Sequence, residues 1–329
     1  MRLPPISILS SARRYPLKAR RAAAPASAML LCLALSACTS STPRVDDATP
    51  ISLSGGGITL YAAGDIADCR KRAPQDTMAA RTAEVIDAGL AADPSAVAVT
   101  LGDNVYQSGT PEEHANCYAP TWGRFKARTL PSPGNHEYYS ADASGYYDYF
   151  GPLAGPDRRG YYSTELGLWH VLSLNSNLKG AAQQAQLDWI KADLAAHHAP
   201  CALAYWHHPV FSSGGHGNNE VMRAAWQLLA AAGVDLVLSG HDHDYERFAP
   251  QDLDGQPNPR EGMRQFVVGT GGAELSPFRL MRANSLVANN TNYGVLRMEL
   301  RPDGYTWQFM PVADGSLHDA GSARCRAKP

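Results

Sequence analysis

Two histidines, two aspartates, a glutamate and an arginine lie within ten residues, "SGHDHDYERF" (239–248), directly after the apolar run "VDLVL". A short apolar run predicts a buried strand, so the polar groups should stand at its carboxyl end. In open α/β sheets, functional side chains gather at such ends. The density of ionisable groups therefore predicts a functional loop rather than a solvated turn.

Other polar clusters follow apolar runs in the same way. Gly64-Asp65 follows "ITLYAA", Gly102-Asp103 follows "SAVAVTL", His207 follows "CALAYW", and Asn135-His136 lies in the tight turn "PSPGNHE". Each motif alone is more often a simple turn. Five clusters at five strand ends are hard to obtain by chance, and their carboxylate, amide and imidazole groups suffice to bind two metal ions. Two ions about 3.5–4 Å apart can clamp the attacking and leaving oxygens of a phosphoryl displacement.

The segments between these clusters alternate between strand and helix patterns. Apolar residues share one helical face in three stretches: Met78, Val85, Ile86 and Leu90; Leu187, Ile190 and Leu194; Met222, Trp226 and Leu229. This alternation predicts an α/β fold with largely buried strands. The later runs "RQFVVGTGG", "YGVLRMEL" and "YTWQFMPV" have little helix between them, which predicts a second, more antiparallel sheet.

The N-terminal segment has the composition of a targeting signal. Six basic and no acidic residues lie between Met1 and Ala37, and the apolar stretch Met29–Ala37 is too short to span a bilayer. We therefore predict a signal peptide (1–37), a polar linker (38–57) and one domain (58–329). Removing the six basic residues changes the net charge from −2 to −8, so nucleic-acid binding is not expected.

Leu35-Ser36-Ala37-Cys38 resembles the bacterial lipobox, in which the cysteine is acylated and becomes the new N-terminus. This resemblance implies a lipoprotein signal peptide and a lipid anchor on Cys38, at the periplasmic face of a bacterial membrane. The alternative is an ordinary signal peptide that is cleaved nearby and releases a secreted protein.

Four cysteines remain beyond Cys38, namely Cys69, Cys117, Cys201 and Cys325, in a compartment that permits disulfides. Four cysteines allow three pairings. We favour Cys69 with Cys117 and Cys201 with Cys325, because the first two lie in loops that follow candidate active-site strands. Reduced, buried cysteines are the alternative.

The series of clusters resembles the calcineurin-like metallophosphoesterases, on the motifs Gly64-Asp65, Gly102-Asp103-Asn104-Val105-Tyr106, Gly134-Asn135-His136-Glu137, His207 and Gly240-His241-Asp242-His243. A tyrosine three residues after the aspartate, as Tyr106 is after Asp103, makes the motif similar to that of the purple acid phosphatase branch. The resemblance covers about residues 58 to 311 and implies a four-layer αββα sandwich of two packed mixed β-sheets. We expect a short bacterial form without the N-terminal β-sandwich domain of plant members.

The resemblance also implies two metal ions and their ligands. A first ion, usually Fe(3+), would be bound by Asp65, Tyr106 and His243, and Asp103 would bridge to a second. The second ion, divalent zinc, manganese or iron, would be bound by Asn135, His207 and His241. His208 stands where the family often has tyrosine, and Ala67 where it usually has glycine, so the role of His208 and the geometry of the first loop are open.

His136 and His216 match family histidines that orient the substrate phosphate and protonate the leaving oxygen. A plain loop histidine is the alternative for His216. The resemblance implies an acid phosphatase-like enzyme in which a metal-bound hydroxide attacks a small phosphomonoester in line.

A phosphodiesterase or nucleotide hydrolase on the same metals is one alternative function. An anchored metal- or phosphate-binding protein without catalysis is another, although it would not need the proton donors His136 and His216. Tyr138, Tyr139, His114 and Arg247 are further candidates for substrate contact, against the alternative that they pack in the structure.

Overall fold

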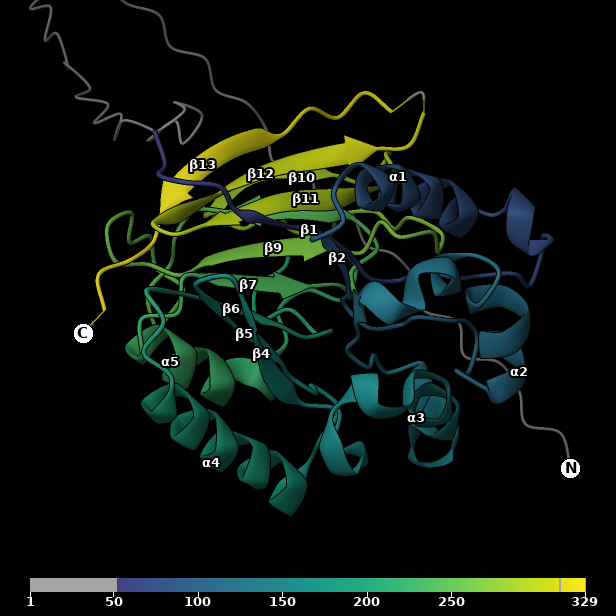
Figure 1. The fold of residues 1–329 in the computed structure, drawn as a ribbon, viewed down its shortest axis with the longest axis horizontal. Helices are drawn as coiled ribbons and strands as arrows, with labels where there is room; N and C mark the ends of the chain where they lie inside the picture. The colour runs from purple at the N-terminus through teal and green to yellow at the C-terminus, as the bar shows by residue number, and fades with distance from the viewer. Residues whose placement is uncertain (1–51, 314, 329) are drawn as a thin grey trace, which may run out of the picture. The chain divides into compact units, whose positions relative to one another are not determined.

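A computed structural model describes residues 52–313 and 315–328. Two β-sheets lie next to each other, with helices on their outer sides (Figure 1). The α-helices are α1 (Met78–Ala92), α2 (Pro111–Glu113), α3 (Ser144–Phe150), α4 (Gly180–Ala196) and α5 (Arg223–Ala231). Short helical turns are η1 (Pro74–Asp76), η2 (His114–Tyr118), η3 (Trp122–Arg128), η4 (Glu137–Tyr139), η5 (Ala141–Ala143), η6 (Gly151–Ala154), η7 (Pro156–Arg158) and η8 (Glu220–Met222).

The first sheet has six strands and is mixed. Its order is β13 (Ala320–Arg324), β12 (Gly304–Pro311), β11 (Gly294–Arg301), β1 (Ile58–Ala63), β2 (Val97–Thr100) and β3 (Thr129–Leu130). Strand β1 is parallel to β2 and antiparallel to β11. The carboxyl ends of β1 and β2 therefore meet at one edge of this sheet.

The second sheet has seven strands and is also mixed. Its order is β10 (Ser285–Asn289), β8 (Tyr245–Phe248), β9 (Arg264–Val268), β7 (Leu236–Ser239), β6 (Cys201–Tyr205), β5 (Trp169–Ser173) and β4 (Tyr162–Leu166). Strands β5, β6, β7 and β9 run parallel to one another. The loops after β6 and β7, which carry predicted site residues, thus leave the sheet side by side.

The predicted four-layer α/β architecture is confirmed, and the apolar runs have a physical reason. On β6, Leu203 packs into the core that also contains Leu60 and Val99 of the other sheet, whereas its neighbour Ala204 packs toward Trp226 of α5. Successive residues of a strand point to opposite faces. Because both faces of the central strands are buried, their sequences read as continuous apolar runs.

The predicted second, more antiparallel sheet is confirmed for β11 and β12, which pair antiparallel with each other, but the predicted division of the strands between the sheets is wrong. Strand β9 pairs in parallel with β7, whereas β1 and β2 share a sheet with β11. An apolar run shows that a strand is buried, but its pairing depends on how the chain crosses between layers. The prediction also missed β8, which lies inside the ten-residue polar segment and is buried throughout.

The predicted apolar face of the first helix is correct except at one end. Ile86 and Leu90 of α1 are buried, whereas Met78 is 36% exposed. Met78 is the first residue of α1, directly after Thr77, whose hydroxyl caps the helix by accepting from the Ala80 N–H at 3.2 Å. The segment before the helix, residues 70–73, is exposed as well.

Both favoured disulfides are present, Cys69–Cys117 and Cys201–Cys325. The second joins the start of β6 to the chain after β13, across 124 residues. A cross-link over a loop of this length stabilises a fold by about 5 kcal/mol in the chain-entropy model. Two disulfides indicate an oxidising compartment outside the cytoplasm.

Within the described residues, no helix combines the length and the apolar character needed to cross a bilayer. The predicted signal peptide, Cys38 and most of the predicted linker lie outside those residues.

Candidate metal centre

The predicted site lies where the two sheets are joined at the carboxyl ends of their strands. The Gly64 N–H, after β1, donates to the Val268 carbonyl at the end of β9 at 2.9 Å. The Gly240 N–H, after β7, donates to the His207 carbonyl after β6 at 3.0 Å. These bonds hold loops from both sheets at fixed positions, so side chains that are far apart in sequence converge.

Three predicted ligands have left-handed backbone conformations. The φ angles are 59° at Asp65, 48° at Asp103 and 72° at His241. This region costs a non-glycine residue about 1–2 kcal/mol, and such positions cluster at functional sites. Glycine tolerates this conformation, and Gly102, directly before Asp103, also has a positive φ of +81°.

Gly64 has another role. A Cβ there would lie 2.9 Å from the Leu101 carbonyl oxygen, so glycine is needed for close approach of the two loops. Asp65 itself makes the turn, and aspartate tolerates a positive φ better than most residues.

Asp65, Tyr106 and His243 form the first group of converging side chains. The Tyr106 hydroxyl lies 3.1 Å from Asp65 Oδ1 and 3.2 Å from His243 Nε2, and His243 Nε2 lies 3.3 Å from Asp65 Oδ1. His243 Nδ1 lies 2.8 Å from the Glu274 carbonyl oxygen, which can only accept a hydrogen bond. Nδ1 therefore carries a proton, and Nε2 faces the group.

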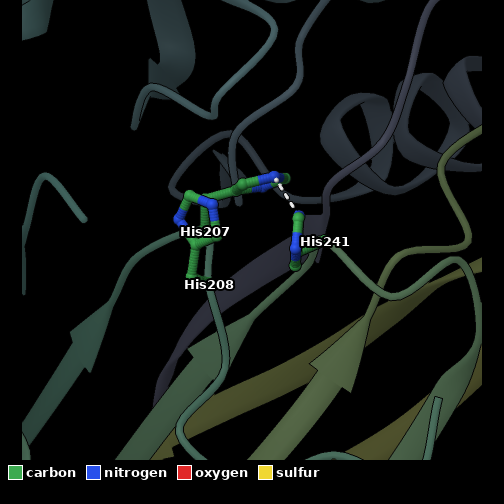
Figure 2. Close-up of side chains that lie close together, drawn as sticks. All are labelled: His207, His208 and His241. Carbon is green, nitrogen blue, oxygen red and sulfur yellow. Dashed lines mark hydrogen bonds between the residues drawn. The ribbon is translucent and has the colours of Figure 1, made fainter. Parts of the chain in front are cut away.

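Asn135, His207 and His241 form the second group. His207 Nε2 lies 3.0 Å from Asn135 Oδ1 and 3.2 Å from His241 Nδ1. The contact between the two imidazoles is the dashed line in Figure 2. His207 Nδ1 is held by the Leu101 carbonyl oxygen at 2.8 Å, so Nε2 again faces the group.

Asp103 lies between the two groups. Its Oδ2 is 3.3 Å from the Tyr106 hydroxyl and 3.2 Å from His207 Nε2, and the side chain is almost fully buried. Asp65, Asp103 and His207 each offer a ligand atom within 4.8 Å of the others. All seven predicted ligands are thus brought into one connected cluster.

The chemistry of this cluster fits metal ions. Although burial opposes ionisation, His207 and His136 keep the pKa of Asp103 below its usual range. Burial alone would lower the pKa of His207, but the Asp103 carboxylate raises it to about 9. Burial and Asp65 raise the pKa of the Tyr106 phenol, so a phenolate there needs a nearby cation. Carboxylate, phenol, amide and imidazole donors suit divalent and trivalent metals, and ligating histidines typically donate their other N–H to a carbonyl.

His136 and His216, predicted to act in catalysis, lie beside the cluster rather than within it. The backbone N–H of His136 donates a hydrogen bond to Asp103 Oδ1 at 2.9 Å. The centroid of the His136 ring lies 4.5 Å from that of the Tyr106 ring. The His216 ring stacks on His241 with centroids 4.2 Å apart. Both histidines therefore contact predicted metal ligands.

His208, whose role the sequence left open, joins the second group. His207, His208 and His241 offer nitrogen atoms within 4.8 Å of one another, and Figure 2 shows the three imidazoles together. Burial, followed by the charge on His207, lowers the pKa of His208 to about 3. His208 is therefore a neutral imidazole beside the cluster.

Glu137, for which the sequence indicated no role, is fully buried behind the cluster. Its carboxylate accepts hydrogen bonds from the backbone N–H groups of Asp103 at 3.1 Å, Asn104 at 2.8 Å and Gly134 at 2.6 Å. Burial and the charge on Asp103 raise its pKa to about 7. Glu137 holds together the loops that carry Asp103 and Asn135, and its place in the motif "GNHE" was the available signal.

Asp242 was also missed. Its carboxylate is fully buried. Oδ1 accepts a hydrogen bond from the backbone N–H of His216 at 2.7 Å and also lies 3.0 Å from Nδ1 of the His216 ring. Its other oxygen accepts from the Ser212 hydroxyl. Asp242 thereby orients the His216 ring, and the signal was its position inside "GHDH".

Two of the residues considered for substrate contact pack elsewhere. His114 is fully buried, with Nδ1 3.0 Å from the Thr110 carbonyl oxygen and its ring against Tyr149. Arg247 pairs with the Asp319 carboxylate at 2.8 Å and lies over Trp307. Tyr138 and Tyr139, by contrast, line a pocket together with Asn135.

Comparison with known proteins agrees with this geometry. Residues 58–245 match the model of the calcineurin-like phosphoesterase family. Purple acid phosphatase 18 of Arabidopsis thaliana is 32% identical over 125 residues, which are 36% of this chain and 28% of that protein. The matched regions span between a quarter and two fifths of the first curated relatives.

Two solved structures share the fold. A purple acid phosphatase from yellow lupin (Lupinus luteus) seeds superposes with a TM-score of 0.63 at 19% identity, covering 84% of this chain and 55% of that one. GAP50, described as the anchor in the inner membrane complex of Plasmodium, superposes with a TM-score of 0.63 at 15% identity, covering 83% and 90%. At these identities the likeness shows the fold alone. With the family model matching more than half of its length, the chain belongs to the calcineurin-like phosphoesterase family and is purple acid phosphatase-like.

Proposed function

We propose that this protein is a dinuclear metal phosphatase that hydrolyses small phosphomonoesters. The observation that carries the proposal is the position of the Asp103 carboxylate, within 3.3 Å of Tyr106 in one donor group and 3.2 Å of His207 in the other. A carboxylate placed between two donor groups is suited to bridge two cations. The purple acid phosphatases among its relatives support the same class of reaction.

The predicted ligands would bind the two metal ions in two groups. Asp65, Tyr106 and His243 would hold Fe(3+), and Asn135, His207 and His241 would hold a divalent ion, Zn, Mn or Fe, with Asp103 shared. When bound, the two ions would acidify a water and neutralise charge on the phosphoryl oxygens. Glu137 would hold the loops that carry Asp103 and Asn135 at fixed positions, because its carboxylate accepts hydrogen bonds from backbone N–H groups of both loops.

His136 and His216 would act on the substrate. His216 Nδ1 faces Asp242, which leaves Nε2 to donate a proton to the leaving oxygen. His136 Nδ1 lies 2.7 Å from the Gln107 carbonyl oxygen, so Nδ1 carries the proton there and Nε2 is directed elsewhere. Nε2 of His136 lies 3.7 Å from Asp103 Oδ2, at the edge of the ligand cluster, where a phosphate oxygen would bind.

The test uses the purified mature protein. We expect about two metal ions per chain and hydrolysis of 4-nitrophenyl phosphate that stops after chelation and returns when iron and a divalent ion are restored. Faster hydrolysis of bis(4-nitrophenyl) phosphate would replace the monoesterase proposal with a diesterase. No hydrolysis of either ester by the metal-loaded protein would reject the enzyme proposal.

Replacing His216 with alanine should preserve both metals and reduce turnover, because His216 contacts Asp242 and His241 without belonging to the ligand set. Loss of a general acid typically costs about 10²–10⁴-fold, and the loss should be larger for phenyl phosphate than for 4-nitrophenyl phosphate, whose leaving group needs no proton. Exposed His198 of the loop after α4 supplies the control variant His198→Ala. Equal turnover of wild type and His216→Ala on phenyl phosphate would reduce His216 to a loop residue.

We further propose that residues 58–329 form the catalytic domain and that a lipid on Cys38 anchors it at the periplasmic face of a bacterial membrane. The lipobox-like sequence before Cys38 and the two disulfides support an exported protein.

A further inference from the structure

A pocket of about 530 Å³ opens beside the candidate metal centre, on the side of Asn135 and His208. His208 lies between the metal centre and the pocket. The centroid of its ring is 4.4 Å from that of His241, and His208 also lines the pocket. A larger cavity of about 580 Å³ lies at α4 and α5, but none of the predicted ligands lines it. The pocket beside Asn135 is therefore where the organic part of a phosphate ester would extend from the metal centre.

Lys179 gives this pocket a positive charge. It is exposed directly before α4, and its side chain forms no ion pair or hydrogen bond with another described residue. The described residues that line the pocket include no carboxylate. By contrast, the exposed Lys191 of α4 is paired with Asp188 at 3.7 Å. An unpaired ammonium on a wall without acids favours an anionic group in the pocket.

His208 adds an oriented ring nitrogen. The Ser176 hydroxyl accepts from the His208 backbone N–H at 3.2 Å and lies 2.8 Å from His208 Nδ1. These two contacts fix the orientation of the ring, with Nδ1 on the side of Ser176 and Nε2 on the other side. Nε2 is the ring nitrogen that can contact an oxygen of the ester between the metal centre and the pocket.

Tyr139 supplies an aromatic surface on the same wall. Its side chain is 60% exposed, yet the ring is held by His136 at 4.7 Å and its hydroxyl accepts from the Asn135 amide at 3.3 Å. An exposed ring that is fixed at both ends can pack against a planar leaving group without losing further freedom.

We propose that this pocket selects phosphomonoesters whose leaving group carries a second anionic group, which Lys179 binds while His208 and Tyr139 position the ester. The inference rests on the proposed phosphatase function and specifies its substrate class. The monoester phosphate would lie at the metal centre, and the second anion, a carboxylate or another phosphate, would lie at the open end of the pocket.

The test compares phenyl phosphate with 4-carboxyphenyl phosphate, which differ by one carboxylate. Lys179→Met should lower kcat/KM for the carboxylated ester by about three- to fivefold more than for phenyl phosphate, mostly through KM, since an exposed charge pair contributes modestly. Lys179→Arg should retain the preference, and the difference should shrink in 1 M salt because exposed charges are screened. Lys191→Met is the matched control, because Lys191 lies on the same helix and pairs with Asp188.

The outcomes separate the two proposals. If the wild type hydrolyses neither ester, the phosphatase proposal fails. If it hydrolyses both, and Lys179→Met leaves the ratio of their kcat/KM values unchanged, the phosphatase proposal stands and the anionic selectivity is wrong.

Discussion

Asp103→Ala is expected to abolish phosphatase activity and to lower the metal content of the purified protein. Asp103 is almost fully buried and contacts both donor groups, so its removal leaves two close cations without their shared counter-charge. Removing one partner of a buried ionic contact costs about 3–5 kcal/mol, which corresponds to a loss of roughly 10²–10³-fold or more. Metal analysis and turnover of 4-nitrophenyl phosphate measure the two effects.

The control is Asp148→Ala, because Asp148 is 59% exposed and pairs only with Arg158 among the described residues. This variant should keep metals and turnover. If Asp103→Ala retained two metal ions per chain, Asp103 would not be the bridging ligand, even if activity were lost.

Tyr106→Phe is expected to remove the visible absorption of the iron-loaded protein. Phenolate is a hard anionic oxygen that suits Fe(3+), and charge transfer from phenolate to iron gives a purple or pink colour. The Tyr106 hydroxyl lies 3.1 Å from Asp65 and 3.2 Å from His243, so a cation bound by these two residues would be within its reach. Absorption spectra of wild type and variant, at equal iron content, test the assignment.

Tyr149→Phe is the matched control, since its ring packs against His114 and Phe150 and contacts none of the predicted ligands. It should leave the colour unchanged. A colourless, fully active wild type that contains only divalent metals would refute the ferric role of Tyr106 and leave a phosphoesterase centre of another composition.

Much of the candidate site could be predicted because its signal is local. The strands β1, β2, β6 and β7 are short apolar runs, and each is followed within a few residues by a polar side chain. Parallel strands of one sheet bring their carboxyl ends to one edge, so the loops after β1 and β2 lie near each other, as do those after β6 and β7. The two disulfides were predicted on similar grounds, from the loops in which Cys69 and Cys117 lie.

The supporting residues could not be assigned in the same way. Glu137 and Asp242 stand inside the quoted motifs, but their roles depend on which backbone N–H groups and rings face them after folding. For Arg247 and His114 the sequence left substrate contact and packing open, and the structure decides for packing, against Asp319 and Tyr149 respectively.

The amino-acid sequence by itself determined which candidate ligand residues are present, their order along the chain and the strand ends at which they stand. Only the tertiary structure decided that β9 pairs with β7 and that β1 lies beside β11. It also decided that Asp65 rather than Gly64 has the left-handed backbone conformation, and that Lys179 and His208 share a pocket. The reason is that hydrophobic periodicity depends on neighbouring residues. Strand partners, close backbone approach and pocket walls instead arise from contacts between segments that are far apart in the sequence, whose pairing no local pattern specifies.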